Sequence, residues 1–333
     1  MNEISNEISI KLISGNNVDQ CNSFFEGVIG QTAVISKLKF FIDSNSSNIV
    51  FPTLLFTGSH GLGKTYVAEK LAKNLNRKYV EVNCGTLETL DDFINGVLID
   101  KVLGTESVTL LLDEAHKIPS KIATVLLTLL APKSNSISIL KLKDKSILYD
   151  MSKINVIFGT TDAYLMPKPL LNRSQRVYFE HYNKEEMLQM LKLYLPHVNF
   201  ECDLEDLANA CRGRGRDAFQ LAQNIKRYCF INKNNTIDET AWNKMKEIFE
   251  IYSLGLNRQE IELLKIIKEH QSISCANIAM FLMINEENVE GELEIRCREL
   301  GLINNTSKGR ELSEIGEEYV NEMEMEFSEL QEV

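Results

Sequence analysis

The chain has 333 residues, a hydrophobic content of 44% and a formal net charge of −11. That length suffices for two or three domains, and the composition is ordinary for a globular protein. There is no run of about 18 apolar residues, and the N-terminus "MNEISNEISIKL" lacks an apolar signal core. We therefore expect a cytoplasmic protein without a membrane span. The seven scattered cysteines, with no C-x-x-C pair, favour reduced thiols and argue against structural zinc.

The charge is unevenly distributed along the chain. Residues 254–333 hold 18 acidic and 7 basic side chains, whereas residues 1–253 hold 29 of each. If the C-terminal part binds nucleic acid, it must do so through a local basic patch, because its overall charge repels phosphate.

Short apolar runs alternate with helical patterns over the first half of the chain. After a variable lead-in, a turn and an amphipathic helix precede the buried-strand runs, which are "FPTLLFT", "KYVEVNC", "SVTLLLDEAH" and "INVIFGTTD". Helical patterns such as "VAEKLAKNL" and "SKIATVLLTLLA" separate them. This alternation predicts an α/β fold with a parallel sheet and helices on both faces.

A glycine-rich loop follows the first of these strands. "GSHGLGKT", residues 58–65, has the glycine, lysine and threonine spacing of a phosphate-binding loop. Its glycines allow successive N–H groups to point at phosphate oxygens, beside the positive end of the following helix. Lys64 would reach the β- and γ-phosphates of ATP, and the Thr65 hydroxyl would hold Mg²⁺. The alternative is an ordinary glycine-rich strand-to-helix turn.

Two acids end the run "TLLLDEAH". In an α/β sheet, ligands bind at the carboxyl ends of the strands. Asp113 would hold Mg²⁺ through water, and Glu114 would activate the attacking water. Acids at a strand end are weak evidence alone, but about fifty residues after a phosphate loop they are a strong indication.

The second half of the chain is mainly helical. From "NKEEMLQMLKLYL" to about residue 253 the pattern is typical of a small helical domain, and "SLGLNRQE" marks a linker. Three helical segments and the turn "NNTSKGRELS" then follow, which is the plan of a winged helix. The remaining "EEYVNEMEMEFSELQEV" reads as a solvated acidic helix.

Together these motifs resemble the AAA+ ATPases, and among them RuvB, the Holliday-junction branch-migration motors. The resemblance runs from about Phe24 to about Tyr319 with the motifs in matching order. It implies an AAA+ core, a helical lid and a C-terminal winged helix. The expected organisation is a lead-in (1–25), the ATPase domain (26–180), the lid (181–253), the winged helix (254–320) and an acidic tail (321–333).

The resemblance also implies roles for further residues. Thr161 would sense the γ-phosphate, unless it is only a polar strand end. Arg173 would be an arginine finger that reaches a neighbouring subunit. Arg216 would be the lid arginine that contacts the nucleotide, although Arg212 and Arg214 are close. The expected contacts to ATP or ADP are Val28, Ile29, Gly58, Ser59, His60, Gly61, Leu62, Gly63, Lys64, Thr65, Tyr66, Tyr182 and Arg216. Tyr182 could equally be a core tyrosine of the lid.

Several positions depart from the family pattern. Ser59-His60 stands where the family has two prolines, and "LLNRSQ" lacks the Asp before and the Phe-Gly after the finger arginine. Asp162 replaces an arginine. A hairpin at 137–151 has the expected place and length but an altered sequence. In RuvB this hairpin contacts the partner RuvA, so a different protein partner is expected here.

The wing turn "TSKGR" would contact DNA. Lys308 and Arg310 would meet phosphates, the alternative being that both are merely solvated. The segment "NEENVEGELE" carries five glutamates, which is unfavourable in a major groove.

Three functional hypotheses remain open. The first is an ATP-driven DNA motor of the RuvB type that works as a hexameric ring. The second is a RuvB-derived protein, such as one encoded by a mobile element, that loads or remodels a protein complex. The third is a scaffold that binds ATP but hardly hydrolyses it, which the presence of Lys64, Asp113, Glu114 and Arg173 disfavours.

Overall fold

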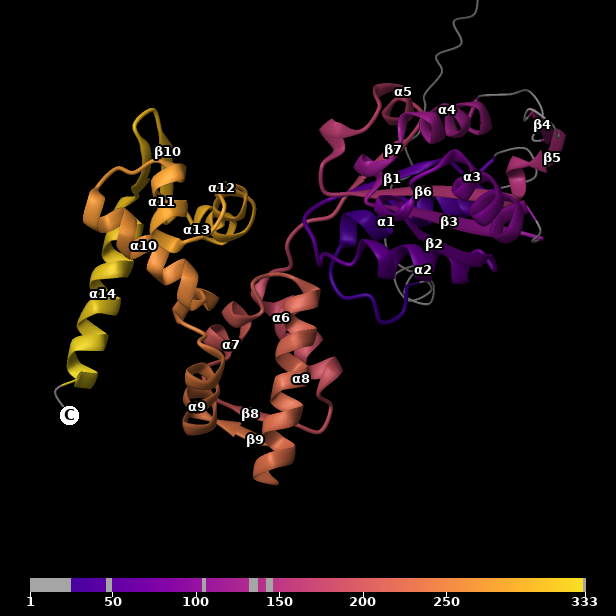
Figure 1. Cartoon of the computed structure of the whole chain (residues 1–333). Helices are drawn as coiled ribbons and strands as arrows, with labels where there is room; N and C mark the ends of the chain where they lie inside the picture. Colours follow the sequence, from indigo (N-terminus) through magenta and orange to yellow (C-terminus); the bar gives the residue numbers. More distant parts are fainter. Residues whose placement is uncertain (1–24, 46–49, 104–105, 132–136, 142–145, 332–333) are drawn as a thin grey trace, which may run out of the picture. The chain divides into compact units, whose positions relative to one another are not determined.

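The computed structural model describes residues 25–45, 50–103, 106–131, 137–141 and 146–331. The chain divides into two compact units, Met1–His181 and Tyr182–Val333. Figure 1 shows the helices and strands of each unit. No helix among the described residues is both long enough and apolar enough to cross a membrane.

A five-stranded parallel sheet forms the centre of the first unit, with strand order β2-β3-β6-β1-β7. Its strands are β1 (Leu54–Thr57), β2 (Lys78–Asn83), β3 (Val108–Asp113), β6 (Ile154–Thr160) and β7 (Gln175–Tyr178). The predicted α/β fold with a parallel sheet is confirmed. Since all five strands are parallel, their carboxyl ends meet at one edge, where a ligand site is expected.

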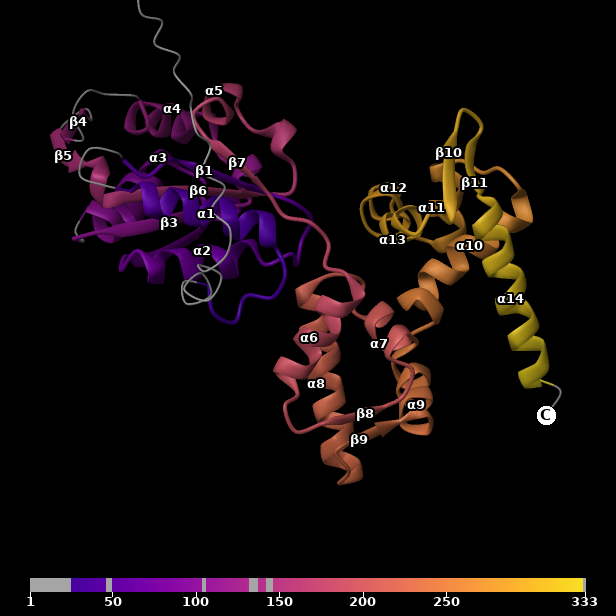
Figure 2. The same cartoon turned by 180° about the vertical axis from the view of Figure 1, so that it is seen from behind.

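Helices cover both faces of this sheet (Figure 1 and Figure 2). They are α1 (Thr32–Ser44), α2 (Lys64–Asn74), α3 (Leu90–Phe93, continued by a π-helical stretch Ile94–Leu103), α4 (Ser120–Leu129) and α5 (Lys168–Leu171). Alternate strand residues such as Leu55, Leu110 and Phe158 pack with α3 and α4 in one core. The intervening residues, such as Phe56 and Leu111, are also fully buried, so the strands read as continuous apolar runs.

The predicted hairpin is present beside this sheet. Strands β4 (Ile137–Lys141) and β5 (Ser146–Asp150) pair antiparallel, with Ile139 opposite Leu148. The turn 142–145 lies outside the described residues. Tyr149 is buried, and its hydroxyl approaches the Leu129 carbonyl oxygen at 3.5 Å. The hairpin is therefore anchored on the end of α4.

The second unit begins with the helical lid. It contains α6 (Lys184–Tyr194), α7 (Leu204–Ala210), α8 (Gly215–Asn232) and α9 (Glu239–Phe249), with a small parallel pair of β8 (Asn199–Glu201) and β9 (Thr236–Asp238). A reciprocal capping box of Asn183 and Glu186 starts α6. Trp242, fully buried on α9, donates from its indole N–H to Asp206 on α7. This contact fixes α9 on α7.

The winged helix follows in the same unit. Its elements are α10 (Arg258–His270), α11 (Cys275–Leu282), α12 (Glu286–Asn288, continued by a π-helical turn Val289–Leu293), α13 (Glu294–Glu299), β10 (Ile303–Thr306), β11 (Gly309–Leu312) and α14 (Glu314–Gln331). Helix α14 runs across the predicted boundary at 320/321. Met323 lies beyond that boundary but is buried in the winged-helix core. The start of the predicted acidic tail therefore belongs to this domain.

Candidate nucleotide site and winged-helix surface

The phosphate loop, residues Gly58–Thr65, connects β1 to α2. Lys64 is the first residue of α2, and its side chain is almost fully buried. Its ammonium group donates to the carbonyl oxygens of Gly58 and Ser59, at 2.8 and 2.9 Å. The loop is thus folded around the lysine. A loop of this kind, with a buried ammonium group at a helix N-terminus, fits the phosphates of a nucleotide.

Two glycines of the site are required by close approaches. Gly58 has φ +151°, and a Cβ there would lie 2.7 Å from the Phe179 carbonyl oxygen. Gly159, on β6, has no room for a side chain because a Cβ would lie 2.8 Å from a carboxylate oxygen of Asp113. Any larger residue at Gly159 would displace the Asp113 carboxylate from its place beside β6.

Three strand ends bring the predicted catalytic side chains to one edge. β6 lies between β1, which leads into the phosphate loop, and β3, which ends at Asp113. Thr57 pairs with Thr160 across β1 and β6, and Leu112 pairs with Phe158 across β3 and β6. The loop, the acidic pair and the threonines are therefore neighbours. The Thr65 hydroxyl and the Asp113 carboxylate are oxygen groups of the kind that Mg²⁺ favours, and their role as its ligands stays a prediction.

Glu114 follows β3 in the left-handed region, with φ 52°. Its carboxylate is only 17% exposed and has three basic neighbours. His116 Nε2 lies 3.5 Å away, Lys117 Nζ 3.3 Å and His60 Nδ1 3.9 Å. A positive φ is uncommon for a non-glycine residue and indicates that the surrounding structure holds Glu114 in place.

The two threonines at the end of β6 have different partners. Thr160 is buried, and its hydroxyl bonds His116 Nδ1 at 2.9 Å. The Thr161 hydroxyl donates to its neighbour Asp162 at 2.6 Å. Asp162, which stands where the family has an arginine, therefore engages the predicted sensor directly.

The segment "VIGQ", residues 28–31, is held against the start of α2 and the end of β7. Tyr66 Oη donates to the Gly27 carbonyl oxygen at 3.4 Å, and Lys70 Nζ donates to the Glu26 backbone carbonyl oxygen at 3.1 Å. The Gln31 amide makes two bonds with the backbone of Glu180, at 2.7 and 3.2 Å. Val28 and Ile29 are half-buried between these anchors. They therefore lie in a segment held beside the phosphate-loop helix, and their contact with the nucleotide stays a prediction.

Arg173 lies at the opposite edge of the sheet from the phosphate loop. Arg173 comes just before β7, and the first residue of β7, Gln175, pairs with Leu54 at the start of β1. Arg173 therefore lies at the amino ends of these strands, whereas the phosphate loop begins with Gly58 at the carboxyl end of β1. Arg173 is exposed, and its guanidinium donates to the Leu127 carbonyl oxygen near the end of α4. This carbonyl anchors an arginine that lacks the neighbours usual in the family.

In the second unit, three arginines follow one another at alternate positions. Arg212 and Arg214 pair with the winged-helix residues Glu260 and Glu299. Arg216, in the first turn of α8, is exposed, and no ion pair or hydrogen bond of its side chain is found within the described residues. This difference favours Arg216 as the lid arginine available to a ligand.

Tyr182 is 8% exposed, and its backbone N–H donates to the Gly213 carbonyl oxygen. The buried ring agrees with the alternative of a lid core tyrosine. Its hydrogen bond also ties the start of the lid to the segment that carries the three arginines.

The two basic residues of the wing differ in their surroundings. Lys308 is exposed at the turn between β10 and β11. Arg310 is only 12% exposed, and its guanidinium donates to Glu294 at 2.7 Å and to Glu290 at 2.6 Å. These two acids neutralise Arg310 and hold the wing on α13 and the turn before it. The structure thus leaves Lys308 as the better candidate for a phosphate contact.

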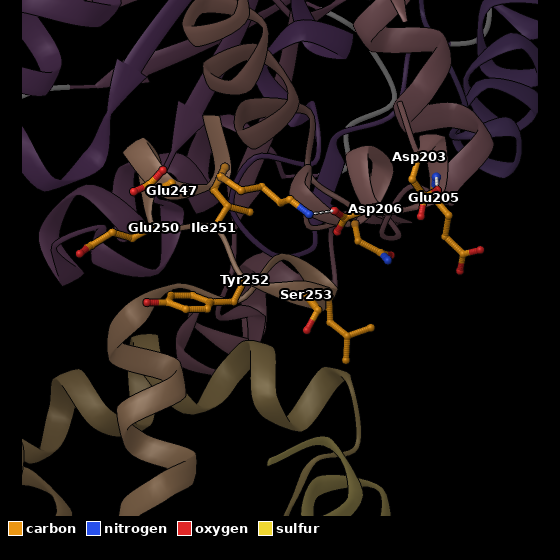
Figure 3. A pocket seen from close by; sticks show the side chains of 11 residues that line it. Asp203, Glu205, Asp206, Glu247, Glu250, Ile251, Tyr252 and Ser253 are labelled. Atoms are coloured by element: carbon orange, nitrogen blue, oxygen red, sulfur yellow. Dashed lines mark hydrogen bonds and ion pairs between the residues drawn. The ribbon is translucent and has the colours of Figure 1, made fainter. Parts of the chain in front are cut away.

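A pocket of about 660 Å³ lies where α7 and α9 meet residues 251–254 (Figure 3). Five of its eleven lining residues are acidic, namely Asp203, Glu205, Asp206, Glu247 and Glu250. None of the predicted site residues lines it. It is part of the lid surface rather than of the predicted nucleotide site.

Comparison with known proteins agrees with this architecture. Residues 54–182 match the model of the ATPase family associated with various cellular activities (AAA), and residues 253–321 match that of the RuvB C-terminal winged helix domain. The fold and these matches define the protein as an AAA ATPase. This class hydrolyses ATP, which it usually binds with Mg²⁺.

The match to RuvB extends over most of the chain. The RuvB subunit of the Holliday junction branch migration complex from Mycoplasmopsis synoviae is 27% identical over 313 residues, covering 89% of this chain and 95% of that protein. The Ehrlichia ruminantium RuvB is 26% identical, covering 92% and 93%. The Thermotoga maritima RuvB structure gives a TM-score of 0.71 at 21% identity, covering 88% and 95%. The protein is therefore a distant homologue of RuvB with the RuvB type of winged helix.

Proposed function

We propose that this protein is a cytoplasmic ATP-hydrolysing motor of the RuvB type, which acts on DNA in branch migration or a related translocation. One observation carries the proposal. A single sheet edge gathers the phosphate loop, Asp113, Glu114 and Thr161, in a chain that also has a winged helix. The resemblance to RuvB over most of the chain supports the same conclusion.

The catalytic roles follow from the chemistry of these side chains. Lys64 binds the β- and γ-phosphates of ATP, while the backbone N–H groups of the loop surround them. Thr65 and Asp113 hold Mg²⁺, which when bound neutralises phosphate charge. Glu114 takes a proton from a water molecule as that water attacks the γ-phosphorus, and the products are ADP and phosphate. Thr161 orients the water or the γ-phosphate from the neighbouring strand.

The position of Arg173 supports a ring. Because it lies at the edge opposite the phosphate loop, Arg173 is badly placed for the nucleotide of its own subunit. In a closed ring, here a hexamer, it reaches the nucleotide of the next subunit and stabilises charge in the transition state, an effect of about 10³ to 10⁵ in rate for related NTPases. Arg216 contacts the nucleotide from the lid.

DNA-dependent ATP hydrolysis tests this function. The purified protein is assayed with Mg²⁺ alone, then with four-way junction, linear duplex and single-stranded DNA of equal nucleotide concentration. A motor of the RuvB type shows the largest increase in turnover with the junction or the duplex, and it separates the arms of a labelled junction. A rate that no DNA changes would remove the motor hypothesis and leave an ATPase with another target.

A second candidate is a RuvB-derived protein that remodels a protein complex. The hairpin favours it, because Ile137, Ile139 and Leu148 are each more than half exposed. By the period-two alternation of strands they share one face, since Ile139 pairs with Leu148. An exposed apolar face of this kind indicates a protein contact. Replacing Ile139 and Leu148 by Ser should leave DNA-independent ATP hydrolysis intact and abolish stimulation by the partner.

A further inference from the structure

His60 belongs to the phosphate loop, and its side chain approaches the proposed base. Its Nδ1 lies 3.9 Å from Glu114 Oε1, and its ring is 63% exposed, whereas the Glu114 carboxylate is 17% exposed. The family has proline at this position, which offers no side-chain donor. The departure Ser59-His60 therefore places a new functional group between the phosphate loop and the carboxylate.

The other basic neighbours of Glu114 come from its own segment. Lys117 lies one helical turn away, at 3.3 Å, and His116 lies 3.5 Å from the carboxylate. His116 is in turn fixed by its bond to Thr160. These contacts position Glu114 with respect to β3 and β6. The contact with His60 connects the Glu114 carboxylate to the loop that is expected to hold the phosphates.

We propose that His60 is a positioning residue for the water-activating carboxylate of Glu114, an inference that rests on the proposed ATPase function. The imidazole N–H donates to the carboxylate oxygen and sets its distance from the γ-phosphate held by the same loop. Catalytic contacts are often long in structures without substrate and tighten in the substrate complex, so a distance of 3.9 Å is compatible with this role. Misplacement by about 1 Å lowers rates by as much as 100-fold.

The first test separates turnover from binding. His60→Ala should lower kcat about 10-fold, the usual scale of coupling between contacting groups. The affinity for a fluorescent ATP analogue should change little, because the phosphates are bound by Lys64 and the backbone N–H groups of the loop, which this substitution leaves in place. His60→Gln should restore much of the lost kcat, since its amide can also donate to the carboxylate. His197→Ala, which removes an exposed histidine of the lid, serves as the matched control and should behave like the parent.

The second test asks whether His60 acts through Glu114. Single-turnover hydrolysis of radiolabelled ATP is compared for His60→Ala in the parent and in Glu114→Gln. The loss should be about 10-fold in the parent and under about 2-fold in the Gln background. Equal losses in both backgrounds, an unchanged kcat or an increased kcat would each overturn the inference. If the parent hydrolyses ATP, such a result contradicts only the role of His60. A parent that does not hydrolyse ATP would instead refute the proposed ATPase function.

Discussion

Arg212 of the lid and Glu260 of the winged helix form a buried ion pair. The Arg212 guanidinium donates to Glu260 Oε1, and the Glu260 side chain is 1% exposed. The second carboxylate oxygen accepts from the Asn257 backbone at 2.8 Å, so the same group caps helix α10. Arg214 pairs with Glu299 at 3.4 Å beside it. The lid segment that precedes Arg216 is therefore fastened to the winged helix.

Arg212→Ala should destabilise the second unit strongly. The substitution leaves a buried carboxylate without its cation, which costs about 3 kcal/mol in free energy of unfolding. Trp242, the single tryptophan of the chain, is fully buried in the lid and reports the transition by fluorescence in urea. The midpoint should fall clearly relative to the parent.

Arg258→Ala is the matched control. It removes an arginine from an exposed pair with Glu250, in which the two side chains are 69% and 53% exposed. Exposed ion pairs contribute little, so its urea midpoint should stay close to that of the parent. If Arg212→Ala unfolded at the same urea concentration as this control, the pair would not hold the two domains together.

The core of the fold could be predicted from the sequence. The largely apolar runs at 54–57, 108–113 and 154–160 are typical of strands buried on both faces, and all three are paired in the parallel sheet. The phosphate loop follows β1 and the two acids end β3, so both lie at the carboxyl ends of the parallel strands, as the sequence order predicts. Local patterns fix such features because each depends on residues adjacent in the chain.

The contacts between distant segments could not be predicted. "TSKGR" suggests two basic residues on an exposed turn, but Arg310 is neutralised by Glu290 and Glu294, which lie elsewhere in the sequence. The ion pair of Glu260 with Arg212 has no local signal either, because the two residues are 48 positions apart in the sequence. The contact of His116 with Glu114 had a signal, the "DEAH" spacing, but its bond to Thr160 requires the fold.

Glu114→Gln and Lys64→Ala should separate hydrolysis from binding. The Gln variant keeps the loop and should bind ATP like the parent, yet turnover should be almost abolished because the carboxylate that takes the proton is lost. Lys64→Ala should lose ATP binding itself, since the ammonium group meets the phosphates. Titration with a fluorescent ATP analogue and phosphate-release assays measure both properties. Near-normal turnover of Glu114→Gln would show that Glu114 is not the base.

Lys308→Ala should weaken DNA binding without affecting the fold. The lysine is exposed at the wing turn, so its removal should lower the salt dependence of binding by about one unit for one lost phosphate contact. ATP hydrolysis measured without DNA should be unchanged. Fluorescence anisotropy of labelled duplex at several salt concentrations gives the slope, and a parental slope would exclude Lys308 from the DNA contact.

Arg310→Ala should instead destabilise the winged helix. Its guanidinium neutralises Glu294, which is 1% exposed, and the loss leaves that carboxylate buried without its nearest cation. We expect a lower melting temperature, with a loss of DNA affinity only where the domain unfolds. The opposite result is a variant that melts like the parent but loses DNA affinity and one unit of salt slope. That result would show that Arg310 contacts a phosphate.

Arg173→Ala tests the ring itself. The variant should still bind ATP, because the phosphate loop is untouched and lies at the other edge of the sheet. It should hydrolyse ATP poorly, because the developing charge on the phosphoryl group lacks its cation. Full activity of Arg173→Ala alone would show that this arginine is not the finger, and its hydrogen bond to the Leu127 carbonyl would then be structural.

Mixing Arg173→Ala with Lys64→Ala subunits shows whether the arginine acts on a neighbour. Each variant alone should be almost inactive. In a mixed ring, an Arg173→Ala subunit keeps an intact phosphate loop and receives Arg173 from a Lys64→Ala neighbour, so part of the activity should return. The recovered rate should rise with protein concentration, because it depends on assembly. A mixture that co-assembles by light scattering but gains no activity would mean that the interface requires more than one intact site, or that Arg173 does not act in trans.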